Sequence, residues 1–316
     1  MVLVVDPITE QDLDRGDAIF RAAFAAIERK DPTTMFGDAD AYRTRWRARN
    51  TRFIAAREDG ELVGSNVLTR WGSLATFGPL TVTPDRWDRG IARALMERTE
   101  EVFGEWKVTH RALFTFANSP KHIALYQKFG YWPSYLTPML ERSVGSAPTG
   151  NEEESRYSLL SNKPLPEQAS ILSETRDLCD ELLPGFDVTG EIESVRDQHA
   201  GETVLLFDRS RLEGFAVCHI GARTEASSGE TYVRFAMVRP GAGRNERLKA
   251  LLAEVEALGG DRRAPSIQFG CNLSHRETYR TLVGMGYRSD FIGVAMVSGN
   301  DVAYLRPEFD VLDDWR

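Results

Sequence analysis

Apolar residues recur along the first part of the chain at the spacings of helices and strands. Residues 12–28 and 90–106 place apolar side chains every three or four positions, which is typical of a helix with one buried face. Residues 53–57 and 62–68 are short apolar runs on either side of Asp59-Gly60, a pair that favours a hairpin turn. The pattern therefore predicts helices alternating with an antiparallel pair of strands.

Local stop and start signals extend this prediction. Ser119 is a typical N-cap residue, Pro120 suits the first helical position, and Gly130 suits a helix end, so a helix is expected over residues 120–129. The other predicted elements are an opening strand over residues 1–7, a short helix over 40–50, and strands over 76–83 and 112–116. These elements predict an α/β fold, a mixed sheet flanked by helices.

The pattern then repeats. The stretch VTPDRWDRGIARALM begins at Val82 and VRPGAGRNERLKALL begins at Val238, 156 positions later; the Gly-Tyr pairs at Gly130 and Gly286 are also 156 positions apart. Two ungapped matches at one offset predict a tandem duplication of an α/β domain of roughly 150 residues. The hairpin matches at an offset of 150 instead, which indicates a short insertion near residues 223–230.

A polar stretch rich in Gly, Ser, Pro and Glu separates the two copies. It covers residues 145–155 and is expected to be a linker. The predicted domains are therefore residues 1–144 and 156–316.

Composition narrows the class of protein. The 316 residues are 42% hydrophobic and 27% charged, with a formal net charge of -8, so neither a nucleic acid nor an anionic membrane is expected as a partner. No apolar run approaches the length of a membrane helix, and residues 1–7 lack the basic start of a signal peptide. A cytoplasmic protein is expected.

Cysteine and histidine spacing gives no metal signature. Cys179, Cys218 and Cys271 are widely separated, and the five histidines show neither an HxxxH nor an HExxH spacing. We therefore expect no disulfide framework and no metal.

Two ordered motifs in the first copy suggest a family. The strand residues Val82-Thr-Pro84 lead into the turn Trp87-Asp-Arg-Gly-Ile-Ala92 and a helix, and Asn118, Ala124-Leu-Tyr126 and Phe129-Gly-Tyr131 follow. This resembles the GNAT acetyltransferase superfamily, with its turn Gln/Arg-x-x-Gly-x-Gly/Ala and its later signature Asn-x-x-Ala-x-x-Leu-Tyr-x-x-x-Gly-Phe, here loosened near the Asn. Trp87 departs from the usual Gln or Arg. The resemblance covers residues 1–144 well and 153–300 as a diverged copy.

The resemblance implies acetyl-CoA as the co-substrate. A helix N-terminus offers unpaired N–H groups and a positive dipole end to its pyrophosphate, and a glycine there lets the backbone approach closely. A plain strand-to-helix turn with solvated arginines is the alternative. The implied cofactor-binding residues are Leu80, Thr81, Val82, Arg89, Gly90, Ile91, Ala92, Arg93, Ala94 and Asn118.

The resemblance also implies catalytic residues. Tyr126 would protonate or hydrogen-bond the leaving thiolate, since a phenol holds its proton at pH 7. No acidic residue lies in residues 76–82, so His122 is a candidate general base and an ordered water is the alternative. The expected wall of the substrate pocket comprises Asn66, Arg70, Trp71 and Phe77.

The second copy lacks these groups. At the offset of 156, Tyr126 corresponds to Leu282, Gly90 to Glu246 and Ala92 to Leu248, so the second domain is predicted to be degenerate. The resulting hypothesis is an acetyl-CoA-dependent N-acetyltransferase acting on a small-molecule amine, as a monomer or homodimer. The alternatives are a non-catalytic acyl-CoA-binding or regulatory protein and a protein-lysine acetyltransferase.

Overall fold

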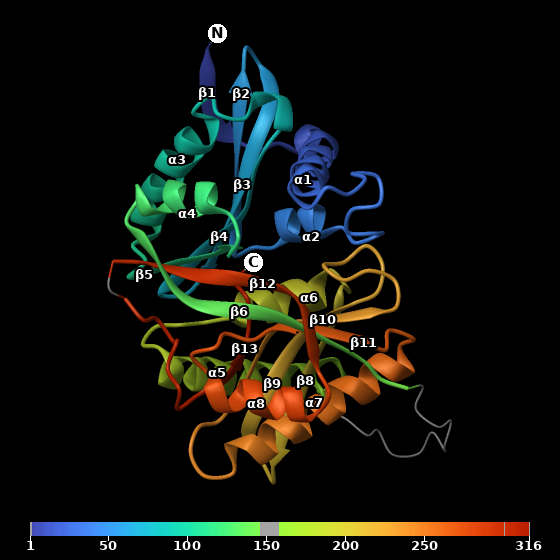
Figure 1. Cartoon of the computed structure of the whole chain (residues 1–316). Helices are drawn as coiled ribbons and strands as arrows, with labels where there is room; N and C mark the ends of the chain where they lie inside the picture. The colour runs from blue at the N-terminus through green and yellow to red at the C-terminus, as the bar shows by residue number, and fades with distance from the viewer. Residues whose placement is uncertain (1, 146–157, 300, 316) are drawn as a thin grey trace.

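One continuous sheet runs through the whole molecule (Figure 1). The computed structural model describes residues 2–145, 158–299 and 301–315. We call residues 2–145 the first half and residues 158–315 the second half. All but the first residue of the predicted linker lies outside the described residues. Among the described residues, no helix combines the length and the apolar character needed to cross a membrane.

The first half follows the predicted order of helices and strands. Its elements are β1 (Leu3–Pro7), α1 (Leu13–Glu28), α2 (Ala41–Arg47), β2 (Thr51–Glu58), β3 (Glu61–Trp71), β4 (Leu74–Val82), α3 (Ile91–Trp106), β5 (His110–Phe116), α4 (Pro120–Gln127) and β6 (Tyr131–Ser143). Short 3-10 turns cover Glu10–Asp12 and Pro84–Arg86.

The second half repeats this order with longer helices. Its elements are β7 (Ser158–Leu159), α5 (Leu165–Leu182), α6 (Thr189–Asp197), β8 (Gly201–Asp208), β9 (Arg211–Ile220), β10 (Glu230–Val238), α7 (Arg244–Asp261), β11 (Ser266–Gly270), α8 (Arg276–Gly284), β12 (Arg288–Ser298) and β13 (Asp310–Leu312).

The two halves exchange strands at the centre of the sheet. The strand order is β1-β2-β3-β4-β5-β12-β6-β11-β10-β9-β8-β7. Thus β12 of the second half lies between β5 and β6 of the first, and β6 pairs in turn with β11. In Figure 1, β6 and β12 cross the middle of the molecule between the two sets of helices. Each half therefore depends on a strand from the other to complete its sheet.

Helices cover both faces of β1–β5. In Figure 1, α1 and α2 lie on one side of these strands, and α3 and α4 lie on the other. The apolar stripe of α3 includes Leu95, Val102 and Phe103, all fully buried against the sheet. Burying one such side chain stabilises the fold by about 1.5–3 kcal/mol, so this stripe fixes the helix in place.

One expected helix cap differs in detail. Ser119 precedes α4 as predicted, but its hydroxyl does not bond a free backbone N–H; instead its Oγ lies 2.6 Å from Nδ1 of His122. Gly130 follows the helix with φ of +82°, a left-handed conformation that glycine adopts without strain.

Trp71 lies at the junction of the two halves. Its side chain is buried against Phe186 and Phe235, and its Nε1 donates a 3.1 Å hydrogen bond to Oε2 of Glu191. The next residue, Gly72, has φ of +59° and lies so close to the second half that an added Cβ would overlap the carbonyl oxygen of Gly185. The halves therefore meet backbone against backbone at this turn.

Replacing Gly72 with alanine is expected to lower the free energy of unfolding by about 3 kcal/mol, through backbone strain and overlap with Gly185. The matched variant Gly60→Ala has a similar positive φ, but nothing lies within 4 Å of the added Cβ. Strain alone predicts a loss of about 1 kcal/mol there. Urea denaturation measures both losses, and equal losses would contradict the close contact between the halves.

Candidate functional site

The site begins where β4 and β5 separate. These parallel strands pair only from Leu74 to Phe77 on β4. In the pairing of β4 with β3, Phe77 lies opposite Leu68 and Leu80 lies opposite Asn66, so β4 carries one extra residue, which forms a bulge. Beyond the bulge, no described strand pairs with β4 on its β5 side. A cavity of about 1150 Å³ includes this gap.

One end of the cavity lies at the start of α3. Gly90 is the N-cap residue with φ of +82°, and an added Cβ there would meet nothing within 4 Å. The first N–H groups of α3 have no partner within the helix and carry its positive dipole end, which suits a phosphate group. The cavity is lined here by Leu80, Thr81, Val82, Gly90, Ile91, Ala92 and Arg93.

Trp87 shapes this turn through its side chain. Its Nε1 donates a 2.8 Å hydrogen bond to the carbonyl oxygen of Val82, which ties the turn back to the end of β4. The ammonium group of Lys121 lies 5.6 Å from the centre of the indole ring and 2.7 Å from Asp88. Trp87, which stands where the family pattern has Gln or Arg, thus ties the turn to the end of β4, and the ammonium group of Lys121 lies beside the turn.

Three of the expected cofactor-binding residues do not line the cavity. Arg89 faces Glu58 at 3.8 Å, and Asn118 is exposed in the turn after β5. Ala94 lies one turn into α3, where its N–H already bonds the carbonyl of Gly90 at 3.0 Å. The spacing of a motif does not show which side chains point outward, so this part of the prediction is corrected.

Tyr126 lies deep in the cavity. Its ring contacts that of Phe77, with 5.5 Å between centroids, and its side chain is buried. Burial raises the pKa of the phenol well above its ordinary value of 10, and a hydrogen bond with Thr115 only partly offsets this. The phenol therefore stays protonated and can donate a hydrogen bond to a group in the cavity.

His122 lines the same wall one helical turn earlier. Burial lowers the pKa of its imidazole below the ordinary 6.5, and the charge of nearby Lys121 lowers this pKa further. The ring is therefore neutral at pH 7, with Nδ1 directed at Ser119. A neutral imidazole can accept a proton.

Most of the residues expected to line the substrate pocket lie away from the cavity. Phe77 lines the cavity. Asn66 instead faces α3 and donates from Nδ2 to Oγ1 of Thr99 at 2.9 Å, while Arg70 is exposed. Trp71 is buried against the second half. Adjacent strand residues face opposite sides of a sheet, and the sequence alone does not show which side carries the pocket.

The second half supplies part of the wall of the cavity, through residues that the sequence analysis did not single out. Residues 221–229 connect β9 to β10, whereas only residues 72–73 connect β3 to β4. This is the insertion indicated by the change in offset. It docks on the first half through several hydrogen bonds, which include Asp40 N to Thr224 O at 2.7 Å, Arg223 N to Asp38 O at 3.0 Å, Ser227 Oγ to Phe36 O at 3.1 Å and Ser228 N to Asp38 Oδ1 at 2.8 Å.

Glu225 is the buried charge on this loop. Its Oε2 lies 2.6 Å from Nη2 of Arg45, and Nη1 of the same guanidinium donates to the carbonyl of Gly78 at 3.0 Å. Burial opposes ionisation of Glu225, but the charges of Arg45 and Arg234 outweigh it and hold the pKa of the carboxyl well below its usual range. A carboxylate of the second half is thereby fixed beside the bulge of β4.

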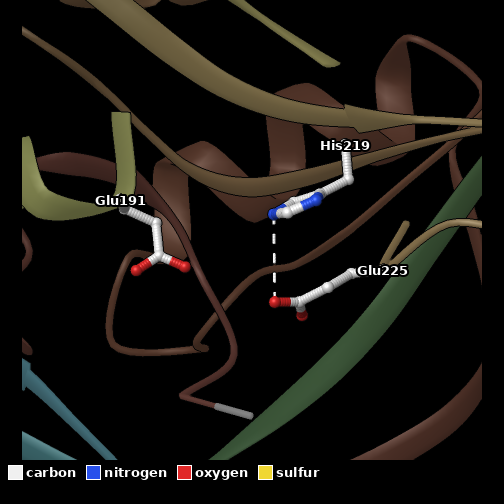
Figure 2. A group of neighbouring side chains, drawn as sticks. All are labelled: Glu191, His219 and Glu225. Atoms are coloured by element: carbon white, nitrogen blue, oxygen red, sulfur yellow. Dashed lines mark ion pairs between the residues drawn. The ribbon is translucent and has the colours of Figure 1, made fainter. Parts of the chain in front are cut away.

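A neighbouring group of side chains has a spacing that a metal ion could use. Figure 2 shows Glu191, His219 and Glu225, whose ligand atoms all lie within 4.8 Å of one another. Each carboxylate already pairs with a guanidinium, Glu191 with Arg234 at 3.3 Å and Glu225 with Arg45. Because Arg45 and Arg234 already pair with one oxygen of each carboxylate, the group is better explained as an ion-paired junction between the halves than as a metal site.

The second half closes its own counterpart of the cavity. β10 pairs with β11 only from Glu230 to Tyr232, and β13 then occupies the same edge from Ala236 to Val238. Asp310 of β13 lies 3.5 Å from Arg244 at the start of α7. In the second half, β13 thus occupies the place that corresponds to the open gap between β4 and β5.

The start of α7 shows which residue of the second half corresponds to Gly90 in the structure. Gly243, not Glu246, is the N-cap residue, and its φ of +76° matches that of Gly90. The glycine is retained because α7 begins earlier than the sequence offset implies. The turn is filled instead by Arg247, whose guanidinium bonds the carbonyls of Arg239 and Ala242 at 2.7 and 2.9 Å.

The whole chain resembles several solved structures in fold. A protein from Pyrococcus horikoshii has a TM-score of 0.69 at 14% identity, covering 99% of this chain and 95% of that one. A GCN5-related N-acetyltransferase from Sphaerobacter thermophilus has a TM-score of 0.61 at 15% identity, covering 95% and 98%. A tandem GNAT protein from the clavulanic acid biosynthesis pathway has a TM-score of 0.58 at 14% identity, covering 94% and 98%.

No curated protein matches the chain in sequence. One family profile does match part of it. Residues 21–131 match the sequence profile of the Acetyltransferase (GNAT) family, a span that includes the Gly90 turn, the separated part of β4 and Tyr126. Residues 21–131 therefore match the Acetyltransferase (GNAT) family in sequence, and the whole chain shares its fold with GNAT proteins.

Proposed function

We propose that the protein transfers an acetyl group from acetyl-CoA to the nitrogen of a small-molecule amine, with the chemistry in the first half. One observation carries the proposal: a single cavity joins the open helix start at Gly90, the unpaired edge of β4 and the buried phenol of Tyr126. Its two ends suit the pyrophosphate and the thioester of one extended molecule.

The residues of this chain have distinct tasks in such a reaction. The protonated amine first loses a proton; its nitrogen then forms a bond to the acetyl carbon as the bond from that carbon to sulfur breaks, and the products are an amide and a thiol besides that proton. The backbone of residues 80–82 aligns the thioester arm, and the Gly90 turn holds the pyrophosphate. Tyr126 donates its O–H to the sulfur as negative charge develops there.

The raised pKa of Tyr126 defines its role more sharply. A phenol that ionises above its ordinary pH range is a weaker acid than a thiol with a pKa of about 8–9. Complete proton transfer from the phenol to the thiolate is therefore uphill. A hydrogen bond that strengthens as charge builds on sulfur is the more favourable contribution, and it requires the enclosed setting in which Tyr126 lies.

A small acceptor suits the enclosed far end of the cavity. The 221–229 loop is hydrogen-bonded across the first half there, which leaves little access for a folded protein surface. The alternatives are a non-catalytic acyl-CoA-binding protein and a protein-lysine acetyltransferase. Tight binding of acetyl-CoA without thiol release for any amine would favour the first, and acetylation confined to protein substrates would favour the second.

Replacing Tyr126 with phenylalanine is expected to lower kcat about 100-fold, because the departing sulfur loses its hydrogen-bond donor. The affinity for acetyl-CoA is expected to stay unchanged. Thiol release across an amine panel measures kcat. Tyr131→Phe is the matched control, since Tyr131 contacts Phe77 but donates its O–H to Glu100 at 2.7 Å; equal kcat losses in both variants would contradict the role of Tyr126.

The Gly90→Glu variant is expected to abolish acetyl-CoA binding, because a carboxylate would stand where the pyrophosphate binds. Gly243→Glu introduces the same residue at the same left-handed N-cap position of α7 and is expected to leave affinity unchanged. Calorimetric titration with acetyl-CoA compares the two. Full affinity in the Gly90 variant would show that the cofactor binds elsewhere.

The pH profile tests His122 as the general base. Because its folded-state pKa lies below 6.5, the imidazole is neutral above that pH and becomes protonated as the pH falls further. We expect kcat to fall on the acidic side of pH 6.5, and His122→Gln to lose about 100-fold in kcat at pH 7.5 together with that pH dependence. A variant that keeps both would assign proton removal to water.

A further inference from the structure

The far arm of the cavity is lined by aromatic rings. It lies between α1, the loop before α2, β5 and β12, and its phenylalanines form a chain of ring contacts. The centroid distances are 4.8 Å for Phe20–Phe36, 5.3 Å for Phe24–Phe36, 5.6 Å for Phe24–Phe116, 5.6 Å for Phe116–Phe291 and 6.0 Å for Phe114–Phe291. A ligand beside these rings meets apolar faces, and charged side chains also line the same cavity.

One enclosed carboxylate lies among the described residues of this lining. The side chain of Glu225 is 3% exposed, whereas that of Glu28 is 25% exposed, Glu230 is half-buried, and Glu141 and Asp290 are exposed. Glu28 already pairs with Lys30 at 2.6 Å. An amine that enters the arm therefore finds its buried negative partner at Glu225.

The position of this carboxylate is fixed with respect to the reacting end. Arg45 holds Oε2 of Glu225 and the carbonyl of Gly78 with one guanidinium, and Gly78 adjoins Phe77 at the point where β4 leaves β5. No described residue hydrogen-bonds Oε1; His219 Nε2 lies 3.8 Å from it, beyond hydrogen-bonding distance. One oxygen of Glu225 is thus available for a ligand.

We propose that the acceptor is a primary amine on an apolar body, of the arylalkylamine class, and that Glu225 of the second half holds its nitrogen. This inference rests on the proposed acetyl transfer. An ammonium group is stabilised by a carboxylate and by the faces of phenyl rings, and an apolar body fills a phenylalanine-lined arm without losing hydrogen bonds. A sugar amine would place several hydroxyl groups against these phenylalanine rings, and a polyamine would place further ammonium groups there, and the rings offer neither a hydrogen-bond acceptor nor a carboxylate.

The competing explanation is that Glu225 serves only as the ion-pair partner of Arg45. In that case its removal would damage folding or cofactor binding but would not affect amine selectivity. A direct binding measurement separates the two roles. The control is Asp290→Asn, which removes one carboxylate charge from an exposed position at the same cavity.

The experiment titrates 2-phenylethylamine into the CoA-bound protein by calorimetry, for wild type, Glu225→Gln and Asp290→Asn. We expect the Glu225 variant to bind the amine about tenfold more weakly, the loss of one charged contact, while the Asp290 variant matches wild type. Unchanged CoA affinity in Glu225→Gln shows that the variant is folded. Unchanged amine affinity in that variant, or an equal loss in both variants, would overturn the assignment of Glu225.

Thiol release by the wild type tests the substrate class without any variant. We compare kcat/KM for 2-phenylethylamine, glucosamine and spermidine with acetyl-CoA, and expect the first to be the preferred acceptor. Turnover of glucosamine or spermidine in preference to the arylalkylamine would overturn this inference but support the proposed acetyl transfer. Turnover of no amine, with acetyl-CoA bound, would overturn both.

Discussion

The separation of β4 from β5 after Phe77 is the constraint on which the rest of the molecule depends. Two parallel strands that part inside a sheet leave backbone N–H and C=O groups without strand partners, and buried groups of this kind must be satisfied in some other way. In the first half the gap remains a cavity whose edge is free to receive a ligand. In the second half β13 takes up the equivalent edge of β10. The corresponding strand edge thus borders a cavity in the first half and is paired with β13 in the second.

The second half, whose own strand edge is covered, also contributes to the cavity of the first half. The insertion between β9 and β10 reaches across to the first half, and its Glu225 joins Arg45 beside the bulge of β4. A carboxylate buried without a partner would be costly, so the arginine keeps Glu225 charged in an apolar setting. The second half therefore supplies part of the wall of the cavity that opens in the first.

Local signals predicted the elements well, because helix periodicity and turn residues act over a few positions. Residues 90–106 and the Gly90 turn are examples. Which face of a strand carries the cavity was harder to predict. Asn66 and Trp71 lie on β3 but away from the cavity, because the bulge of β4 and the contacts of the second half decide which side faces the ligand. The insertion was visible as a change in offset, yet nothing local in the sequence showed where it docks. The pairing of β13 was equally hidden, because it depends on contacts between residues distant along the chain.

The exchange of β12 has a consequence for the order in which the protein can become functional during synthesis. β5 has β12 as its neighbour, and Phe291 of β12 packs on Phe114 and Phe116. A ribosome makes residues 288–298 long after Tyr126, so β5 stays an open sheet edge while most of the second half emerges. Such an edge invites pairing with other chains until it is covered. The sheet of the first half is thus completed only after nearly the whole second half has been translated, which ties the completion of the cavity to the synthesis of the second half.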